Sequence, residues 1–393
     1  MDMDNKKRVI QIVDEIAPDL RELTLKIHDN PEIGMTEVKA CAWQVELLQK
    51  YGFTVETGCC ANLPTSYRAV YKSAKPGPVI AFLAEYDALP TVGHGCGHNL
   101  IALVGCGCGI TARTFADEYG GEIRVYGTPA EENGGGKVHM TNAGLFDDCD
   151  AILMAHPSDT NMDSMNTLAL KNFGIEFFGK PAHAAGCPEA GINALDAIIN
   201  FFNLVNGLRQ QTKPDARMHG IITHGGVAPN VIPDYTRAEF YVRSPRMSEV
   251  NELAKRVEKC AEGAALGTGC TYKMQLLTIP LKDTQSNLTL SNLAADHLDE
   301  FLEEKVQRTD CALNPASSDL GDVSYKAPSI QMRFKIGNSA GHTHEFAQDA
   351  CSEYGIQSGL NFVKGLTLTA IDLLSKPEIL AAVKKEHLEK FSA

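Results

Sequence analysis

Apolar residues recur along this chain at two spacings, which predict an alternation of helices and strands. Across residues 5–28 they return every three or four positions, as on one face of an amphipathic helix. Residues 79–84 instead form a short apolar run bounded by polar residues, which is typical of a buried strand. The same criteria predict helices at 36–51 and 99–119, with Asn99 as the N-cap of the latter, and strands at 54–56, 67–71, 123–126 and 151–154.

The alternation changes character near Thr167. From there it predicts a βαββαβ order, with strands at 168–178, 218–224, 235–243 and 271–279 and helices at 190–210 and 247–265. After Pro280 it predicts a helix (288–304), one strand (329–336) and a long helix (355–374), enough to complete the first sheet. We therefore predict an α/β fold with a phosphorylase/hydrolase-like mixed sheet flanked by helices, formed by residues 1–167 and 281–393, and an inserted ferredoxin-like unit, residues 168–280.

The charge of the chain limits the partners that it can bind. A formal net charge of -13 at pH 7, with no basic cluster, argues against nucleic acid and anionic membranes. The polar N-terminus does not resemble a signal peptide, and the least polar stretch, residues 100–112, is too short to cross a bilayer. We therefore expect a cytoplasmic protein.

Cysteine is frequent, with 12 residues, but nothing indicates a disulfide framework. Without an export signal or the spacing of a small secreted domain, we expect reduced thiols that mostly fill the core. Cys96 differs because it lies in the segment Gly93-His94-Gly95-Cys96-Gly97-His98-Asn99, just after a predicted strand and the acidic turn Glu85-Tyr86-Asp87. On an extended loop, Cys96 and His98 point the same way and could bind one metal ion.

Two adjacent carboxylates follow a second predicted strand. Glu131 and Glu132 lie between the strand at 123–126 and the glycine run at 134–136. Because adjacent side chains diverge, one can bind a metal while the other takes a proton from the activated water, a division of labour that metallohydrolases need. A solvated acidic turn is the alternative for this pair taken alone.

Histidines at two further strand ends extend the set of candidate ligands. His156 follows the strand at 151–154, and His342 and His344 follow the strand at 329–336. A single histidine is more often a packed or surface residue, but here the histidines join other donors. The candidate ligands are Cys96, His98, Glu132, His156 and one of His342 and His344. Five donors exceed what one tetrahedral ion with an open position needs, so we predict two divalent ions, zinc before manganese, cobalt or nickel, with the thiolate able to bridge them.

The inserted unit adds polar groups suited to binding a substrate. His183 and Asn230 lie in predicted loops, and Arg243 ends a predicted strand. Such groups can stabilise a developing oxyanion and hold a carboxylate. Each is equally well explained, taken alone, as a turn or sheet-surface residue.

These motifs resemble, over essentially the whole chain, the aminoacylase and glutamate carboxypeptidase family of dinuclear-metal exopeptidases. The likeness is greatest to its amidohydrolase subgroup, which includes hippurate hydrolase, indoleacetyl-amino-acid hydrolases, one of the two subunits of aminobenzoyl-glutamate hydrolase and a cytosolic dipeptidase. It rests on residues 86–90 (YDALP), 95–98 (GCGH), Glu131-Glu132, the loop histidines, 179–193 and 230–233 (NVIP). Many relatives outside the subgroup have His at the position of Glu85 and a bridging Asp at that of Cys96, so this chain follows the thiolate-bearing branch.

The resemblance implies a role for each candidate residue. Glu131 would be the general base and then the acid for the leaving nitrogen, and Asp87 would orient a ligand. His183 would complete the oxyanion site, in many members from the lid of a second subunit, while Asn230 and Arg243 would bind the carboxylate end of the substrate. The two metal ions would be held by Cys96, His98, Glu132, His156 and His342. Residues 1–167 and 281–393 would be the metal-binding catalytic domain, and 168–280 a lid through which we expect a homodimer.

The leading hypothesis is metal-dependent hydrolysis of the amide bond of a small N-acyl amino acid or a dipeptide. The alternative is a non-hydrolytic or partner-dependent subunit that binds amino-acid conjugates. Thiol redox sensing by Cys96 is a third hypothesis, disfavoured because a metal-bound thiolate is already occupied.

Overall fold

The computed structural model describes residues 3–391, which divide into two units. Of the described residues, the first unit comprises 3–166, 284–314 and 319–391, and the second comprises Thr167–Asp283 and Pro315–Ser318. The short segment Pro315–Ser318 belongs to the second unit although it lies far beyond it in the sequence, which no local pattern indicated.

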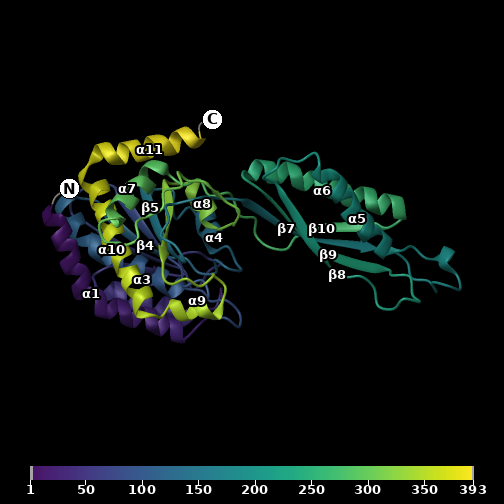
Figure 1. The fold of residues 1–393 in the computed structure, drawn as a ribbon, viewed down its shortest axis with the longest axis horizontal. Helices are drawn as coiled ribbons and strands as arrows, with labels where there is room; N and C mark the ends of the chain where they lie inside the picture. The colour runs from purple at the N-terminus through teal and green to yellow at the C-terminus, as the bar shows by residue number, and fades with distance from the viewer. Residues whose placement is uncertain (1–2, 392–393) are drawn as a thin grey trace. The chain divides into compact units, whose positions relative to one another are not determined.

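The first unit is built on a six-stranded mixed sheet (Figure 1). The order across the sheet is β1 (Thr54–Thr57), β2 (Tyr67–Lys72), β4 (Glu122–Gly127), β3 (Val79–Ala84), β5 (Ala151–Ser158) and β12 (Ser329–Lys335). The last four strands are parallel to one another, and β2 is antiparallel to both of its neighbours. The carboxyl ends of four parallel strands therefore meet at one edge, where ligands bind in open α/β sheets.

Helices cover both faces of this sheet. α3 (His98–Tyr119) packs on β3, β4 and β5, and α1 (Met3–Asp29) and α10 (Glu353–Ser375) pack in turn on α3. A Cβ atom added at Gly105 of α3 would lie 2.7 Å from the carbonyl oxygen of Leu83, so only glycine allows so close an approach to the sheet. The other helices of this unit are α2 (Val38–Lys50), α4 (Gly136–Asn142), α7 (Leu288–Leu298), α8 (Leu320–Ser324), α9 (His344–Asp349) and α11 (Pro377–Phe391).

Strand β3 shows how the sheet divides the core. Ile80 and Phe82 face the large cluster that includes α1, α3 and α10, whereas Ala81 and Leu83 face a smaller cluster with side chains of α4 and α8. Because both faces of β3 are buried, every position of the strand is apolar, and residues 79–84 show no alternation of apolar and polar residues.

The second unit has the predicted βαββαβ order. Its antiparallel sheet runs β10 (Thr271–Leu276), β7 (Ala169–Phe178), β9 (Tyr235–Ser244) and β8 (Arg217–His224), and α5 (Ala194–Arg209) and α6 (Met247–Thr268) pack on it (Figure 1). Alternate residues of β9 are buried, so one face of the sheet meets the helices. The remaining elements are the 3-10 helix Pro188–Ala190 and a pairing of β6 (Asn166–Thr167) with β11 (Leu313–Asn314). The predicted fold class is confirmed.

Several local expectations were wrong. Asn99 is not an N-cap: α3 begins at His98 after Gly97, and the Asn99 amide instead donates to Thr24 Oγ1 (3.0 Å) and to the carbonyl of Ala350 (2.9 Å). The helices α8, α9 and α11 were not predicted.

The bounds of α3, His98–Tyr119, agree with the predicted helix at 99–119. At 22 residues it is long and apolar enough to span a membrane by length and composition, yet 89% of its most apolar window is buried inside the protein. It is accounted for as a core helix.

Candidate metal centre and active site

The candidate ligands of the first unit converge at the carboxyl edge of the parallel strands. Glu85 and Asp87 follow β3, Glu131 and Glu132 follow β4, and His156 lies near the end of β5. Donor atoms of Cys96, His98 and Glu132 lie within 4.8 Å of one another, and so do donor atoms of Glu85, His98 and His156. Sequence spacing alone could not place these residues together, but the parallel topology does.

Asp87 holds two of these groups in place. One of its carboxylate oxygens lies 3.0 Å from His98 Nδ1, and the other accepts the backbone N–H of Glu132 at 3.0 Å. Burial alone would lower the pKa of His98, but Asp87 and Glu85 raise it well above its usual value, so the ring carries a proton at Nε2 that a bound metal ion would replace. Burial alone would raise the pKa of Asp87, but His98 holds it below its usual value.

His156 is oriented in a comparable way. Its Nδ1 donates to the carbonyl oxygen of Pro157 at 2.8 Å, which leaves the Nε2 lone pair free. Burial and the neighbouring His98 lower the pKa of His156 to about 3, so the ring stays neutral, as a metal ligand must. The two rings meet edge to face, with centroids 5.8 Å apart.

Of the two loop histidines, His342 lies beside the cluster. Its Nε2 is 4.0 Å from Glu132 Oε1, its side chain is exposed, and its backbone has a φ of 65°. His344 opens α9, and within residues 3–391 its side chain forms no ion pair with the carboxylates of the cluster.

Glu131 belongs to a different group of donor atoms from its neighbour Glu132. A carboxylate oxygen of Glu131 is within 4.8 Å of oxygens of Glu85 and Asp319, and burial together with Glu85 raises the pKa of Glu131 well above its usual value. The preceding residue, Ala130, has a φ of 59°, and its N–H donates to the buried carboxylate of Glu37 at 2.8 Å. The adjacent carboxylates therefore diverge as predicted: Glu132 lies near the Cys96 thiol, and Glu131 lies near Glu85 and Asp319.

The residues present fit divalent metal ions. Among the described residues, three buried atoms of this cluster have no hydrogen-bond partner: Glu85 Oε2, His98 Nε2 and Glu132 Oε1. When ionised, the five carboxylates Glu85, Asp87, Glu131, Glu132 and Asp319 face two cations, the Lys137 ammonium and the protonated ring of His98, which leaves a net charge of minus three. Unbalanced buried charge is costly, and two divalent cations would offset it.

Cys96 supplies the sulfur donor of this set. Its side chain is 9% exposed, and burial raises the pKa of the Cys96 thiol to about 12, so it is not a reactive free thiolate. All 12 cysteines are free.

The structure adds charged residues that the sequence motifs did not single out. Lys137 Nζ donates to Glu85 and, at 2.6 Å, to Asp319, and all three side chains are fully buried. Although burial alone would lower the pKa of Lys137, Asp319 and Glu85 raise it, so the ammonium is retained. Glu85 could have been singled out because it stands in the acidic turn after the strand at 79–84. Asp319 could not, because it lies between the predicted helix at 288–304 and the predicted strand at 329–336, in a segment without a motif.

In the second unit, two of the three predicted substrate-binding residues lie together. His183 pairs with Val231, next to Asn230, and its Nδ1 accepts the N–H groups of Ala185 (3.2 Å) and Gly186 (3.0 Å). The proton of the neutral ring is therefore on Nε2, on an exposed side chain that can donate it.

Arg243 lies elsewhere in the same unit. The register of β7 and β9 puts Arg243 opposite Leu170 and Tyr235 opposite Phe178, at the other end of the sheet near His183. Eight residues of strand separate the two ends by roughly 27 Å. Arg243 donates to Ser317 Oγ at 3.1 Å and covers the Tyr241 ring. Within one copy of this unit, His183 and Arg243 do not reach the same small molecule.

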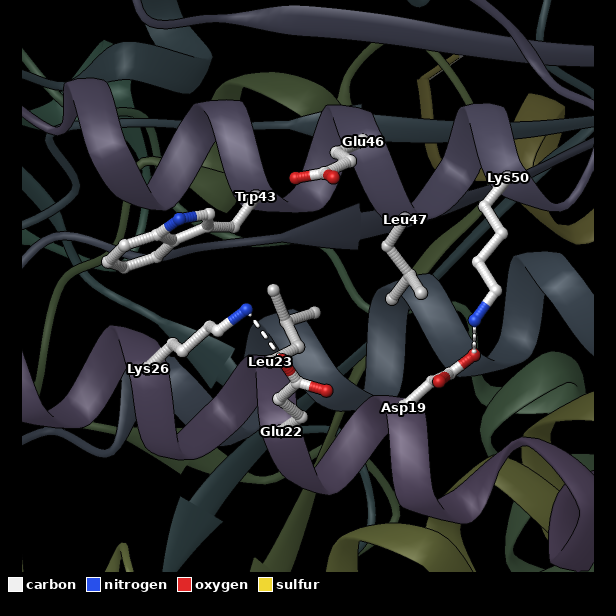
Figure 2. A pocket seen from close by; sticks show the side chains of 8 residues that line it. All are labelled: Asp19, Glu22, Leu23, Lys26, Trp43, Glu46, Leu47 and Lys50. Atoms are coloured by element: carbon white, nitrogen blue, oxygen red, sulfur yellow. Dashed lines mark hydrogen bonds and ion pairs between the residues drawn. The ribbon is translucent and has the colours of Figure 1, made fainter.

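A groove on the first unit lies between α1 and α2 (Figure 2). It has a volume of about 130 Å³, and the ion pairs Glu22–Lys26 and Asp19–Lys50 lie along it. Its lining contains neither histidine nor cysteine, and none of the clustered carboxylates, so it is not the candidate site.

Comparison with known proteins decides the family. Residues 169–268 match the M20 family model described as a peptidase dimerisation domain. The chain is 37% identical over 398 aligned residues to the Xaa-Arg dipeptidase of Mus musculus, covering 97% of this chain and 91% of that protein. The chain belongs to the M20 peptidase family.

Two further similarities fit this M20 assignment. The chain is 31% identical over 439 aligned residues to one subunit of the p-aminobenzoyl-glutamate hydrolase of Escherichia coli (strain K12), covering 92% of this chain and 90% of the relative. Its fold matches the solved structure of a dinuclear metal binding M20 peptidase of Bacillus subtilis, with a TM-score of 0.66 and 20% identity over 96% of this chain and 100% of that one. The predicted family is confirmed. The prediction that the protein is a hydrolase of peptide or amide bonds that uses divalent metal ions is confirmed as well.

Proposed function

We propose that this M20 enzyme hydrolyses the amide bond of N-acyl amino acids or dipeptides with two divalent ions, zinc before manganese, cobalt or nickel. The observation that carries the proposal is the pair Glu131-Glu132, which places one carboxylate in a ligand group with Cys96 and His98 and leaves its neighbour outside that group. The Xaa-Arg dipeptidase and aminobenzoyl-glutamate hydrolase relatives support this substrate class.

The metal ions would be held by Cys96, His98, Glu132, His156 and His342. When bound, they would supply Lewis acidity that lowers the pKa of a water to about 7 and polarises the substrate carbonyl. Asp87 keeps His98 and Glu132 in position through its two hydrogen bonds. Loss of such an outer partner weakens metal binding even though it touches no metal.

Glu131 performs the proton transfers. It takes a proton from the attacking water and gives it to the leaving nitrogen when the amide bond breaks. Burial and the charge of Glu85 raise the pKa of Glu131 well above its usual value, which favours the protonated carboxyl that gives the proton to the leaving nitrogen.

The second unit would complete the site between two copies of the chain. His183 would donate from Nε2 to the developing oxyanion, and Asn230 and Arg243 would bind the substrate carboxylate. Because His183 and Arg243 lie at opposite ends of their sheet, one copy would supply His183 and Asn230 and the other Arg243. The match to a peptidase dimerisation domain supports a homodimer through this unit. The acidic charge and the free thiols support a cytoplasmic location.

The test separates the base from the ligands. Glu131→Gln should lower kcat by about 10²- to 10⁴-fold while two zinc ions per chain remain bound. Glu132→Gln, the same change one residue later, should lose metal as well as activity. Turnover by Glu131→Gln at the wild-type rate would refute the role of Glu131. The assay is a screen of dipeptides, including those ending in arginine, N-acyl amino acids and aminobenzoyl-glutamate, with and without chelator.

The similarity to a single subunit of a hydrolase favours one second candidate, a chain that is active only with a second polypeptide. Inactivity of the zinc-loaded homodimer against the whole screen, with recovery on adding a second, different polypeptide, would establish it.

A further inference from the structure

A buried charged triad lies beside the predicted ligands. Lys137 Nζ donates to Glu85 Oε1 and to Asp319 Oδ1 (2.6 Å), and the Lys137 backbone N–H donates to Asp319 Oδ2 (2.9 Å). All three side chains are fully buried. Asp319 therefore uses both of its oxygens inside the triad, but Glu85 uses only one.

The second oxygen of Glu85 is directed at His98. Glu85 Oε2 lies 3.4 Å from His98 Nε2, and neither atom has a hydrogen-bond partner although both side chains are fully buried. His98 Nδ1 is already engaged by Asp87, so Nε2 is the nitrogen of this ring that faces Glu85 Oε2 across the gap. Such an arrangement is unfavourable unless a positive charge lies between the two atoms.

The separation of the two atoms fits a metal ion. Ligands at about 2.0–2.1 Å from a tetrahedral zinc lie roughly 3.3–3.4 Å from each other, which matches the 3.4 Å between Glu85 Oε2 and His98 Nε2. A direct charge-assisted hydrogen bond would be shorter, at about 2.7–2.9 Å. The free Nε2 of His156 belongs to the same group of donors.

We propose that Glu85 is a further metal ligand, binding through Oε2 the ion that His98 and His156 also bind. Lys137 acts as a positioning residue that holds its other oxygen, and Asp319 in turn positions Lys137. This assignment rests on the metal centre of the proposed function and adds to it a carboxylate donor. The ion would then have two nitrogen ligands and one oxygen ligand, besides any contribution from Cys96.

The test compares two buried carboxylates changed in the same way. Glu85→Gln keeps the size of the side chain but weakens its oxygen as a ligand. Glu37→Gln is the matched control, because both oxygens of Glu37 already have partners, the N–H of Ala130 and the hydroxyl of Thr65. Zinc affinities are measured by competition with a chromophoric chelator on metal-free full-length protein, with circular dichroism as the check on folding.

We expect Glu85→Gln to bind one zinc ion at least about 10-fold more weakly than wild type, with the second ion little affected, since even outer-shell partners contribute 10- to 100-fold. Glu37→Gln should bind both ions as wild type does. If Glu85→Gln does not fold, the double variant Glu85→Gln, Lys137→Met removes one negative and one positive charge and should show the same loss.

Two results would overturn the assignment, and they are distinguishable. Wild-type affinity for both ions in a folded Glu85 variant refutes Glu85 as a ligand and leaves the metal centre standing. Wild-type protein that binds no zinc, manganese or cobalt refutes the metal centre of the proposed function and Glu85 with it.

Discussion

Glu37 gives a stability prediction that follows from burial of a single carboxylate. The side chain is fully buried, accepts the N–H of Ala130 at 2.8 Å and the hydroxyl of Thr65 at 3.1 Å, and has no cation among these partners. Burial, and the charge of Asp87 nearby, raise the pKa of Glu37 from 4.5 to about 7. A shift of about 2.5 units corresponds to about 3 kcal/mol of difference between the folded and unfolded states.

The sign follows from which state binds the proton more tightly. Between pH 4.5 and 7 the folded protein retains the Glu37 proton and the unfolded chain has lost it. The stability from this group is therefore full below pH 4.5 and lost as the pH rises through 7. Glu37→Gln cannot ionise and keeps an acceptor for Ala130, so at pH 8 it should be more stable than wild type by as much as about 3 kcal/mol.

Urea unfolding of chelator-treated protein from pH 4.5 to 8 measures this effect, with metal removed so that bound cations do not change the field at Glu37. Glu46→Gln is the control: Glu46 is an exposed carboxylate on α2 (Figure 2), the helix that Glu37 precedes as its N-cap residue, and the variant should stay within about 0.5 kcal/mol of wild type throughout. Parallel pH profiles for Glu37→Gln and wild type would refute the argument.

Three other substitutions test separate features. Asp87→Asn should weaken zinc binding about 10- to 100-fold in chelator competition, because it removes the charge that orients His98; wild-type affinity would contradict this. Gly97→Ala should lower the free energy of unfolding by about 1–3 kcal/mol, since the residue has a φ of 70° and its new Cβ would lie 2.8 Å from Pro157; an unchanged urea midpoint would count against the strain. Phe201→Ala should cost the second unit about 3–5 kcal/mol in calorimetry while zinc affinity is kept, and a parallel loss of zinc would show that the two units are not independent.

Much of this architecture was predictable because its signals are local. The βαββαβ order of the second unit follows from strand and helix periods alone, and the candidate ligands Cys96, His98 and Glu132 each stand in a short polar segment at a strand end. A parallel sheet then brings such segments to one edge without further information.

What sequence reasoning missed depends on contacts across long separations. Lys137 joins Glu85, 52 residues earlier, to Asp319, 182 residues later, and no local pattern marks a buried lysine that needs two such partners. Asn99 was predicted as the N-cap because asparagine favours that position. The N-cap is instead Gly97, which has a left-handed backbone conformation. The separation of Arg243 from His183 depends on the strand register, which spacing does not reveal.

The insertion of one unit into the other has a consequence during synthesis. In the finished sheet β5 is flanked by β3 and β12, but roughly 170 residues separate the end of β5 from the start of β12. At about 5–20 residues per second, a ribosome needs roughly 10–30 seconds to make them. For that time one edge of an apolar strand, Ile152-Leu153-Met154, has no neighbour and can pair with another nascent chain. Slower growth at low temperature or added chaperone would therefore raise the yield of folded protein more than changes to the catalytic residues would.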